Sequence, residues 1–121
     1  MIEQIDGFTD DILALHVSGK VTVEDYRDRL IPAARDKIAR HKSLRIYCEI
    51  KDDFAAYTAG AMWEDLKLGI SYWGDFGKMA IVTDSGAIRT AVTLFAPFFQ
   101  HPIRIFPNDQ TAAARAWIAQ R

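Results

Sequence analysis

Short runs with alternating apolar and polar residues are separated along this chain by longer stretches in which apolar residues recur every three or four positions. The short runs predict β-strands and the longer stretches predict helices with one apolar face. The predicted strands span residues 2–5, 12–18, 44–50, 79–83 and 103–106. The predicted helices span residues 23–41, 58–70, 86–97 and 110–119. This order predicts an α/β fold with a mostly parallel five-stranded sheet, in which a hairpin makes the first strand antiparallel.

Residues 44–50 alternate along their whole length, which indicates a strand with one apolar and one polar face. The apolar face comprises Leu44, Ile46, Cys48 and Ile50, and the polar face comprises Arg45, Tyr47 and Glu49. A parallel strand covered by helices on both faces should instead be apolar throughout. We therefore expect helices mainly on one face of the sheet, the other face left to water or to a partner, and Cys48 as an inert buried thiol.

The first predicted helix, residues 23–41, has an N-cap in Thr22 and a weak capping box with Asp25. Pro32 removes one intrahelical hydrogen bond, so we expect a kink at residues 29–33. The apolar stripe of this helix comprises Val23, Tyr26, Leu30, Ala33, Ala34 and Ile38. Its basic end comprises Lys37, Arg40, His41 and Lys42, and this end favours a solvated helix terminus over a phosphate contact, because it matches the macrodipole.

The last predicted helix follows the turn at residues 107–109. We expect its inward-facing residues to be Ala112, Ala113, Ala116 and Trp117. The helix before it begins after Asp84 and Ser85. Ser85 can cap that helix, and a plain N-cap is favoured over a phosphorylation site, although a phosphoacceptor at Ser85 or at Thr58 remains an alternative.

Length and composition predict one globular domain over residues 1–121, because 50% of the residues are hydrophobic and 26% are charged. The 15 basic and 16 acidic residues leave a net charge of -1, which gives no global attraction to nucleic acid. One cysteine, no secretory pattern and no apolar run long enough for a transmembrane segment predict a cytoplasmic protein.

Catalytic and metal-binding patterns are weak in this sequence. His16, His41 and His101 are not at ligand spacing, so we expect neither a metal site nor a cofactor. The adjacent acidic pairs are Asp52 with Asp53 and Glu64 with Asp65. Such neighbours are mostly surface charge, and we expect no enzyme; catalysis by Asp52, Asp53 or Glu64 is the weakest hypothesis.

Aromatic residues are concentrated in the second and third helices and in the loop between them. This set comprises Trp63, Tyr72, Trp73, Phe76, Phe95, Phe98 and Phe99. The third helix is apolar over more of its circumference than one buried stripe requires. Core packing accounts for part of the set, and the remainder indicates either a dimer contact or a pocket for an apolar ligand.

Several local strings resemble the bacterial SpoIIAA-like family, relatives of the STAS domains. They are Gly19-Lys20-Val21-Thr22, Arg45-Ile46-Tyr47-Cys48-Glu49-Ile50, Trp63-Glu64-Asp65-Leu66-Lys67, Gly77-Lys78-Met79-Ala80-Ile81-Val82, Arg104-Ile105-Phe106 and Ala113-Ala114-Arg115-Ala116-Trp117. The resemblance covers essentially the whole chain. It implies a sheet whose strands and helices wind as a β-α superhelix.

The resemblance also implies a function. STAS domains of the anti-sigma-factor antagonist type bind partner proteins and are switched by phosphorylation of a serine after the third strand. The Asp-x-Ser-x-x-Gly pattern of that switch is absent here, and the nearest hydroxyl is that of Thr58. We therefore expect a non-enzymatic binding or regulatory module with a protein partner, most simply a homodimer joined through the apolar third helix and the loop that follows the second helix. The alternative is a carrier or sensor of a lipid or other hydrophobic small molecule, as in related lipid-carrying folds.

Overall fold

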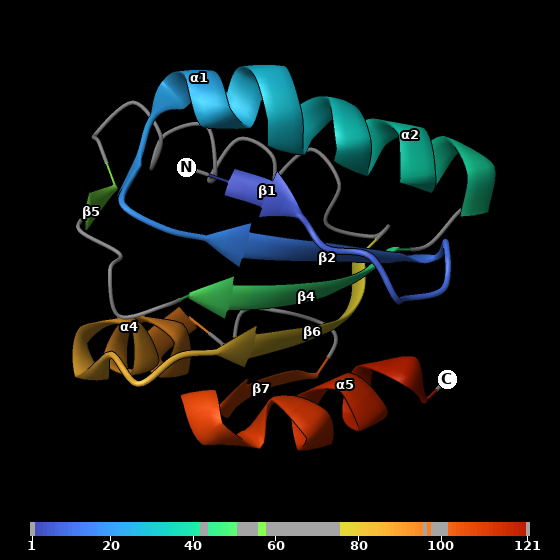
Figure 1. The fold of residues 1–121 in the computed structure, drawn as a ribbon. Helices are drawn as coiled ribbons and strands as arrows, with labels where there is room; N and C mark the ends of the chain where they lie inside the picture. Colours follow the sequence, from blue (N-terminus) through green and yellow to red (C-terminus); the bar gives the residue numbers. More distant parts are fainter. Residues whose placement is uncertain are drawn as a thin grey trace.

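The computed structural model describes residues 2–41, 44–50, 56–57, 76–95, 97 and 102–120. These residues form a five-stranded sheet in the order β1-β2-β4-β6-β7 (Figure 1). Its strands are β1 (Ile2–Gln4), β2 (Ile12–Val17), β4 (Leu44–Ile50), β6 (Phe76–Val82) and β7 (Ile103–Phe106). β1 is antiparallel to β2, and all other neighbours are parallel. The predicted fold class is confirmed.

The helical elements lie between and after these strands. They are α1 (Val23–Asp25), the π-helical turn η1 (Tyr26–Leu30), α2 (Ile31–His41), α4 (Gly86–Phe95), the 3-10 turn η3 (Asn108–Gln110) and α5 (Thr111–Ala119). Two short strands, β3 (Lys20–Val21) and β5 (Ala56–Tyr57), pair with each other in parallel. They were not predicted, because two residues are too few for a periodic pattern.

The predicted capping box at the start of α1 is confirmed. The backbone N–H of Thr22 donates to Asp25 Oδ2 at 2.9 Å, and the N–H of Asp25 donates to Thr22 Oγ1 at 3.3 Å. Pro32 lacks the N–H of an ordinary helical residue, and its ring conflicts with regular α-geometry in the turn before it. The structure places the expected irregularity there, as the wider π-helical turn η1.

The first face of the sheet carries the larger core, and the helices between strands lie over it. Leu13, Leu15 and Leu44 from β2 and β4 pack there with Leu30 and Ala34 from the first helical segment. Since the strand order advances in one direction, right-handed connections place these helices on the same face. Helices mainly on one face were predicted, as was the direction of the apolar residues of β4, half-buried Cys48 included.

The second face of the sheet is not left to water, which corrects one expectation. α5 and the β1–β2 hairpin loop cover it, and Phe8, Tyr47 and Ile118 belong to a second core there. Arg45 and Glu49, read from the sequence as surface residues, are only 9% and 8% exposed. The alternation identified the faces correctly, but it carried no information on α5, which packs on the face opposite the other helices.

The packing of α5 corrects a second expectation. Ala114 and Ile118 are fully buried against the sheet, whereas Ala112, Ala113 and Ala116 are exposed. Trp117 is half-buried at the edge of the second core. Alanines on every side of this helix leave its hydrophobic pattern nearly uniform, so the one large aliphatic residue, Ile118, determines the inward face.

The start of β6 is also earlier than predicted. β6 begins at Phe76 rather than at Met79, and it pairs with β4 across a register irregularity between Leu44 and Ile46. Gly77 and Lys78 interrupt the β-favouring pattern in the sequence, so only pairing with a neighbouring strand extends β6 through them.

Candidate functional site

The N-terminus of α4 is formed by the turn that follows β6. The backbone N–H of Ile88 donates to Ser85 Oγ at 3.3 Å, so Ser85 caps the helix as predicted. The N–H of Ser85 donates to the buried Thr83 Oγ1 at 3.1 Å. These bonds set the direction in which α4 leaves the sheet.

The faces of α4 differ in what they contact. Ile88 and Val92, four residues apart, pack against the first-face core. Leu94 is 68% exposed, and among the side chains that the structure describes it is the large hydrophobic one left in solvent. Exposed Pro97 follows the helix. We call the surface formed by Leu94 and Pro97, at the C-terminal end of α4, the α4 surface.

The predicted aromatic site is described only in part. Phe76 is the first residue of β6 and Phe95 the last residue of α4, so these two positions are placed by their backbones. Outside the described residues lie Trp63, Tyr72, Trp73, Phe98 and Phe99, together with Thr58 and the acidic residues Asp52, Asp53, Glu64 and Asp65. The association of the aromatic set into one surface therefore stays a prediction.

A polar cluster on the second face, buried at Tyr47 and Glu49 and partly exposed at His16 and Arg115, was not predicted as a site. We call His16, Tyr47, Glu49 and Arg115 the Tyr47 cluster. The Tyr47 hydroxyl donates to Glu49 Oε1 at 2.5 Å. His16 Nδ1 lies 3.8 Å from Glu49 Oε2, and Arg115 Nη2 lies 3.8 Å from Glu49 Oε1. The sequence signal for it is the spacing of Tyr47 and Glu49, which places both on one face of β4.

Aromatic packing covers this cluster. The Phe8 ring of the hairpin loop lies 4.8 Å from the Tyr47 ring, centroid to centroid. The Arg115 guanidinium stacks over both rings, at 4.9 and 5.6 Å from their centroids. Burial, and then the hydrogen bond to Glu49, raise the pKa of Tyr47 well above its usual value. The phenol therefore stays protonated, acting as a hydrogen-bond donor and not as a base.

Two basic side chains form hydrogen bonds with the C-terminal end of α5. Arg45 Nη1 donates to the Ile118 carbonyl at 2.6 Å, and Arg45 Nη2 donates to Asp11 Oδ2 at 2.6 Å. Lys78 Nζ donates to the Gln120 carbonyl at 2.9 Å. Positive side chains at a helix C-terminus satisfy its free carbonyls and match its dipole. Both cations therefore anchor α5.

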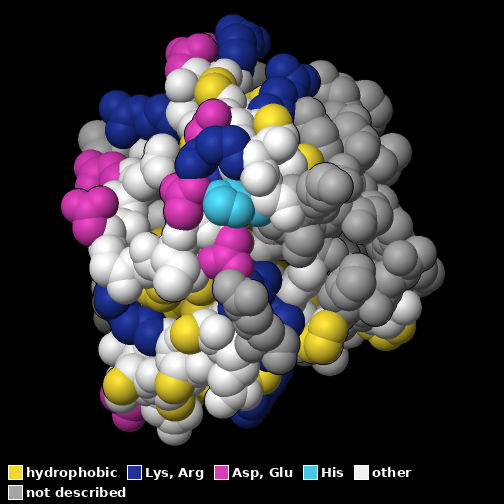
Figure 2. Space-filling view, turned by 90° about the vertical axis from the view of Figure 1, so that its right-hand side faces the viewer, with side chains coloured by type: hydrophobic (Ala, Val, Ile, Leu, Met, Phe, Trp, Pro, Cys, Tyr) yellow, Lys and Arg dark blue, Asp and Glu magenta, His cyan; other side chains and the backbone are white. Residues whose placement is uncertain are grey.

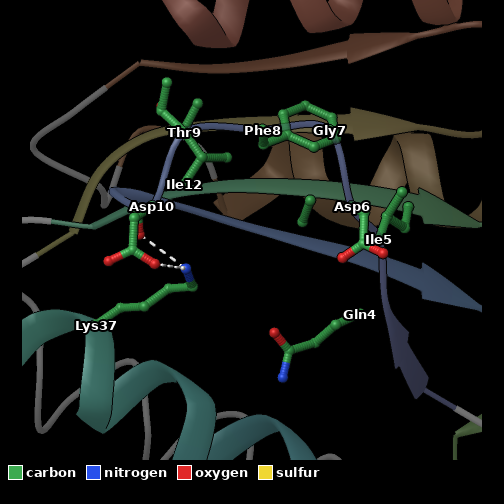
Figure 3. A pocket seen from close by; sticks show the side chains of 10 residues that line it. Gln4, Ile5, Asp6, Gly7, Phe8, Thr9, Asp10, Ile12 and Lys37 are labelled. Carbon is green, nitrogen blue, oxygen red and sulfur yellow. Dashed lines mark hydrogen bonds and ion pairs between the residues drawn. The ribbon is translucent and has the colours of Figure 1, made fainter.

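The basic end of α2 binds the hairpin loop through Asp10. Lys37 Nζ donates to the Asp10 carbonyl at 2.7 Å, His41 Nε2 lies 2.6 Å from Asp10 Oδ2, and Arg40 also pairs with that carboxylate. Figure 2 shows charged side chains of both signs around a histidine on this face, and Figure 3 shows Lys37 directed at Asp10 beside the pocket under the loop. The basic side chains at this helix end are thus paired with an acidic residue of the same chain. This is consistent with the prediction of a helix terminus rather than a phosphate contact.

Metal ligands do not converge in the described part of the chain: no group of three or more His, Cys, Asp or Glu residues there could hold an ion. None of the described helices is long and apolar enough to cross a membrane. The described chemistry is one of hydrogen bonds, ion pairs and apolar contacts.

Known proteins share this fold. A family model described as SpoIIAA-like matches residues 12–119. The chain belongs to the SpoIIAA-like family. A crystal structure of an uncharacterized protein from the DUF3478 family with a SpoIIAA-like fold, from Shewanella loihica PV-4, aligns with a TM-score of 0.78 at 23% identity. The alignment covers 98% of this SpoIIAA-like chain and 92% of that one, and it shows a shared fold. No curated protein matches the chain.

Proposed function

We propose that this SpoIIAA-like chain is a non-enzymatic binding module that acts through the α4 surface, with a second copy of the chain as its first partner. The observation that carries the proposal is Leu94, a large apolar side chain that is 68% exposed on a helix whose Ile88 and Val92 are partly buried against the core. Exposed apolar side chains are the anchors around which protein contacts form. The relation of the family to STAS domains supports a protein partner.

Sedimentation velocity over a range of concentrations tests this proposal. We expect a reversible dimer for the unmodified chain and a monomer for Leu94→Glu, because a buried carboxylate at the contact has no counter-charge. Ala113→Glu, an equally exposed helical position on the opposite face of the sheet, should leave the dimer intact. A strict monomer that also binds no apolar dye or fatty acid would overturn the proposal.

The alternative role, as a carrier or sensor of a hydrophobic small molecule, depends on Trp63, Tyr72, Trp73, Phe95 and Phe98. Exposed Leu94 beside Phe95 is consistent with it. Native mass spectrometry of freshly purified protein separates the two roles. A bound lipid-like mass would favour the carrier, and a ligand-free dimer would favour the protein contact.

A further inference from the structure

A groove runs along the open edge of β1, on the side of the sheet where η1 and α2 lie. Its lining from the strands comprises Ile2, Glu3, Gln4 and Leu15, and its lining from the helical segment comprises Asp28, Arg29, Pro32 and Ala33. Its volume is about 420 Å³. β1 is an edge strand: β2 pairs with it on one side, and on the other side no described strand pairs with it, although the Arg29 side chain contacts the Ile2 carbonyl there (Figure 1).

The hydrogen-bond register determines which backbone groups of β1 point outward. The N–H of Ile5 donates to the Ala14 carbonyl at 2.9 Å, in the register that joins β1 to β2. In an antiparallel ladder, bonded and non-bonded pairs alternate. Glu3 and His16, two positions further along the same register, therefore form a bonded pair, and the backbone of Glu3 points inward to β2.

Ile2 and Gln4, on either side of Glu3, consequently direct their backbone N–H and C=O groups away from β2, toward the outer edge. Arg29 provides independent evidence, because its Nη1 donates to the Ile2 carbonyl at 3.2 Å from outside the ladder. Exposed Gln4 presents the next outward N–H and C=O pair. Figure 3 shows the Gln4 side chain directed toward α2.

The opposite edge of the sheet, at β7, carries features that disfavour such pairing. Pro102 and Pro107 flank β7, and neither has an N–H to donate. Exposed Arg104 adds a charge between them. Prolines and charges are the usual protection of edge strands against added strands. The β1 edge has no proline, and a groove lies beside it.

We propose that the β1 edge binds an extended segment of a partner protein as an added antiparallel strand, with a lysine or arginine opposite Glu3 and apolar residues on either side. Alternating outward N–H and C=O groups match the backbone of another extended chain. The partner residue opposite Glu3 would form a non-bonded pair, in which side chains approach most closely, so its charge should be positive. Its neighbours would point to the accessible apolar surface of Pro32 and Ala33.

A second copy of the chain fits this edge poorly. If β1 pairs antiparallel with β1 of another copy so that Ile2 and Gln4 exchange hydrogen bonds, Glu3 of each copy lies opposite Glu3 of the other. Like charges directly opposite each other destabilise a ladder. The proposed partner of the β1 edge is therefore a different protein, whereas the proposed partner of the α4 surface is a second copy of the chain. The two surfaces can be tested separately.

The probe is the peptide acetyl-Thr-Val-Lys-Val-Thr-amide, titrated into the isotope-labelled full chain and followed by amide chemical shifts. We expect saturable shifts at Gln4 and at the Arg29 side chain. A peptide with glutamate in place of the lysine should bind about fivefold more weakly, since an opposite-charge pair is replaced by a like-charge pair. No saturable binding at millimolar peptide, or shifts centred on another surface, would overturn the proposal.

Two variants make the test specific. Gln4→Pro removes an outward N–H and leaves the bonds between β1 and β2 intact, so binding should be lost while the unfolding midpoint changes little. Glu3→Lys should reverse the preference to the glutamate peptide, which keeps the proposal testable even if Gln4→Pro unfolds. Leu94→Glu should bind the lysine peptide as the unmodified chain does, separating this site from the α4 surface. Unchanged binding in Gln4→Pro, with no reversal in Glu3→Lys, would refute the edge site.

Discussion

Tyr47 and Glu49 form a polar pair inside the molecule, and the Tyr47 hydroxyl has a hydrogen-bond partner in Glu49. Tyr47 is fully buried, and its hydroxyl donates to a carboxylate that is itself 8% exposed. His16 and Arg115 stand near that carboxylate at the surface. A buried carboxylate is tolerated where hydrogen bonds and opposite charges replace water. This pair therefore stabilises the contact between the hairpin loop, β4 and α5.

Tyr47→Phe should lower the free energy of unfolding by about 1–3 kcal/mol, because Glu49 loses the hydrogen bond from the phenol while remaining buried. Urea unfolding at neutral pH measures this change. Phe8→Leu, which alters the same aromatic packing without removing a hydrogen bond, is the control for ring contacts. Stability within the error of the unmodified chain would contradict the assigned role of the hydroxyl.

The pH dependence of this residue has a definite sign. Because the folded-state pKa of Tyr47 is raised above its ordinary value of 10.0, its contribution is complete below pH 10.0 and is lost as pH rises toward the folded-state pKa. The unmodified chain should therefore lose stability above pH 10, and Tyr47→Phe should lose less over the same range. Parallel curves for the two proteins would refute this linkage.

At the scale of elements, two helix starts have hydrogen-bonded caps that local sequence can specify. Thr22 with Asp25 starts α1, and Ser85 starts α4. These caps were predictable because a side-chain oxygen at the N-cap satisfies helix N–H groups within three residues. The start of β6 at Phe76 was not, since pairing with β4 extends that strand beyond its own pattern.

Ser85→Ala should destabilise the protein by about 1 kcal/mol, whereas Ser85→Gly should cost only a few tenths, because glycine tolerates the N-cap geometry. Thermal or urea unfolding of the two variants measures the difference. Thr90→Ala, at an exposed interior position of α4, is the matched control and should not destabilise, since alanine favours helix. Equal losses for alanine and glycine would contradict capping by Ser85.

At the scale of the whole molecule, Asp10 joins parts of the chain that are distant in sequence. It accepts from Lys37 and pairs with Arg40 and His41, about thirty residues further along. The hydrogen bond from His41, with those from Lys37 and Arg40, holds the pKa of Asp10 well below its usual range. The hairpin loop is thereby tied to the end of α2.

Asp10→Asn should lower stability at neutral pH, and the difference from the unmodified chain should disappear in acid. Because the folded-state pKa is depressed, the carboxylate contributes fully above its ordinary pKa of 3.8 and ceases to contribute as pH falls through the lower folded-state value. Added salt should also reduce the difference, because these groups are exposed. Urea midpoints across pH measure it, with Asp109→Asn as the exposed control. A difference unchanged in acid would argue against the ion pairs.

The sequence by itself determined the α/β order, which residues of β4 lie on each face of the sheet, and the caps at Thr22 and Ser85. These features depend on local periodicity and on bonds within a few residues. Only the tertiary structure decided that α5 covers the second face and buries Arg45 and Glu49, because a uniform alanine pattern does not select a side. It likewise decided that Leu94 stays exposed and that no described strand pairs with the outer side of β1, because both follow from which segments pack nearby.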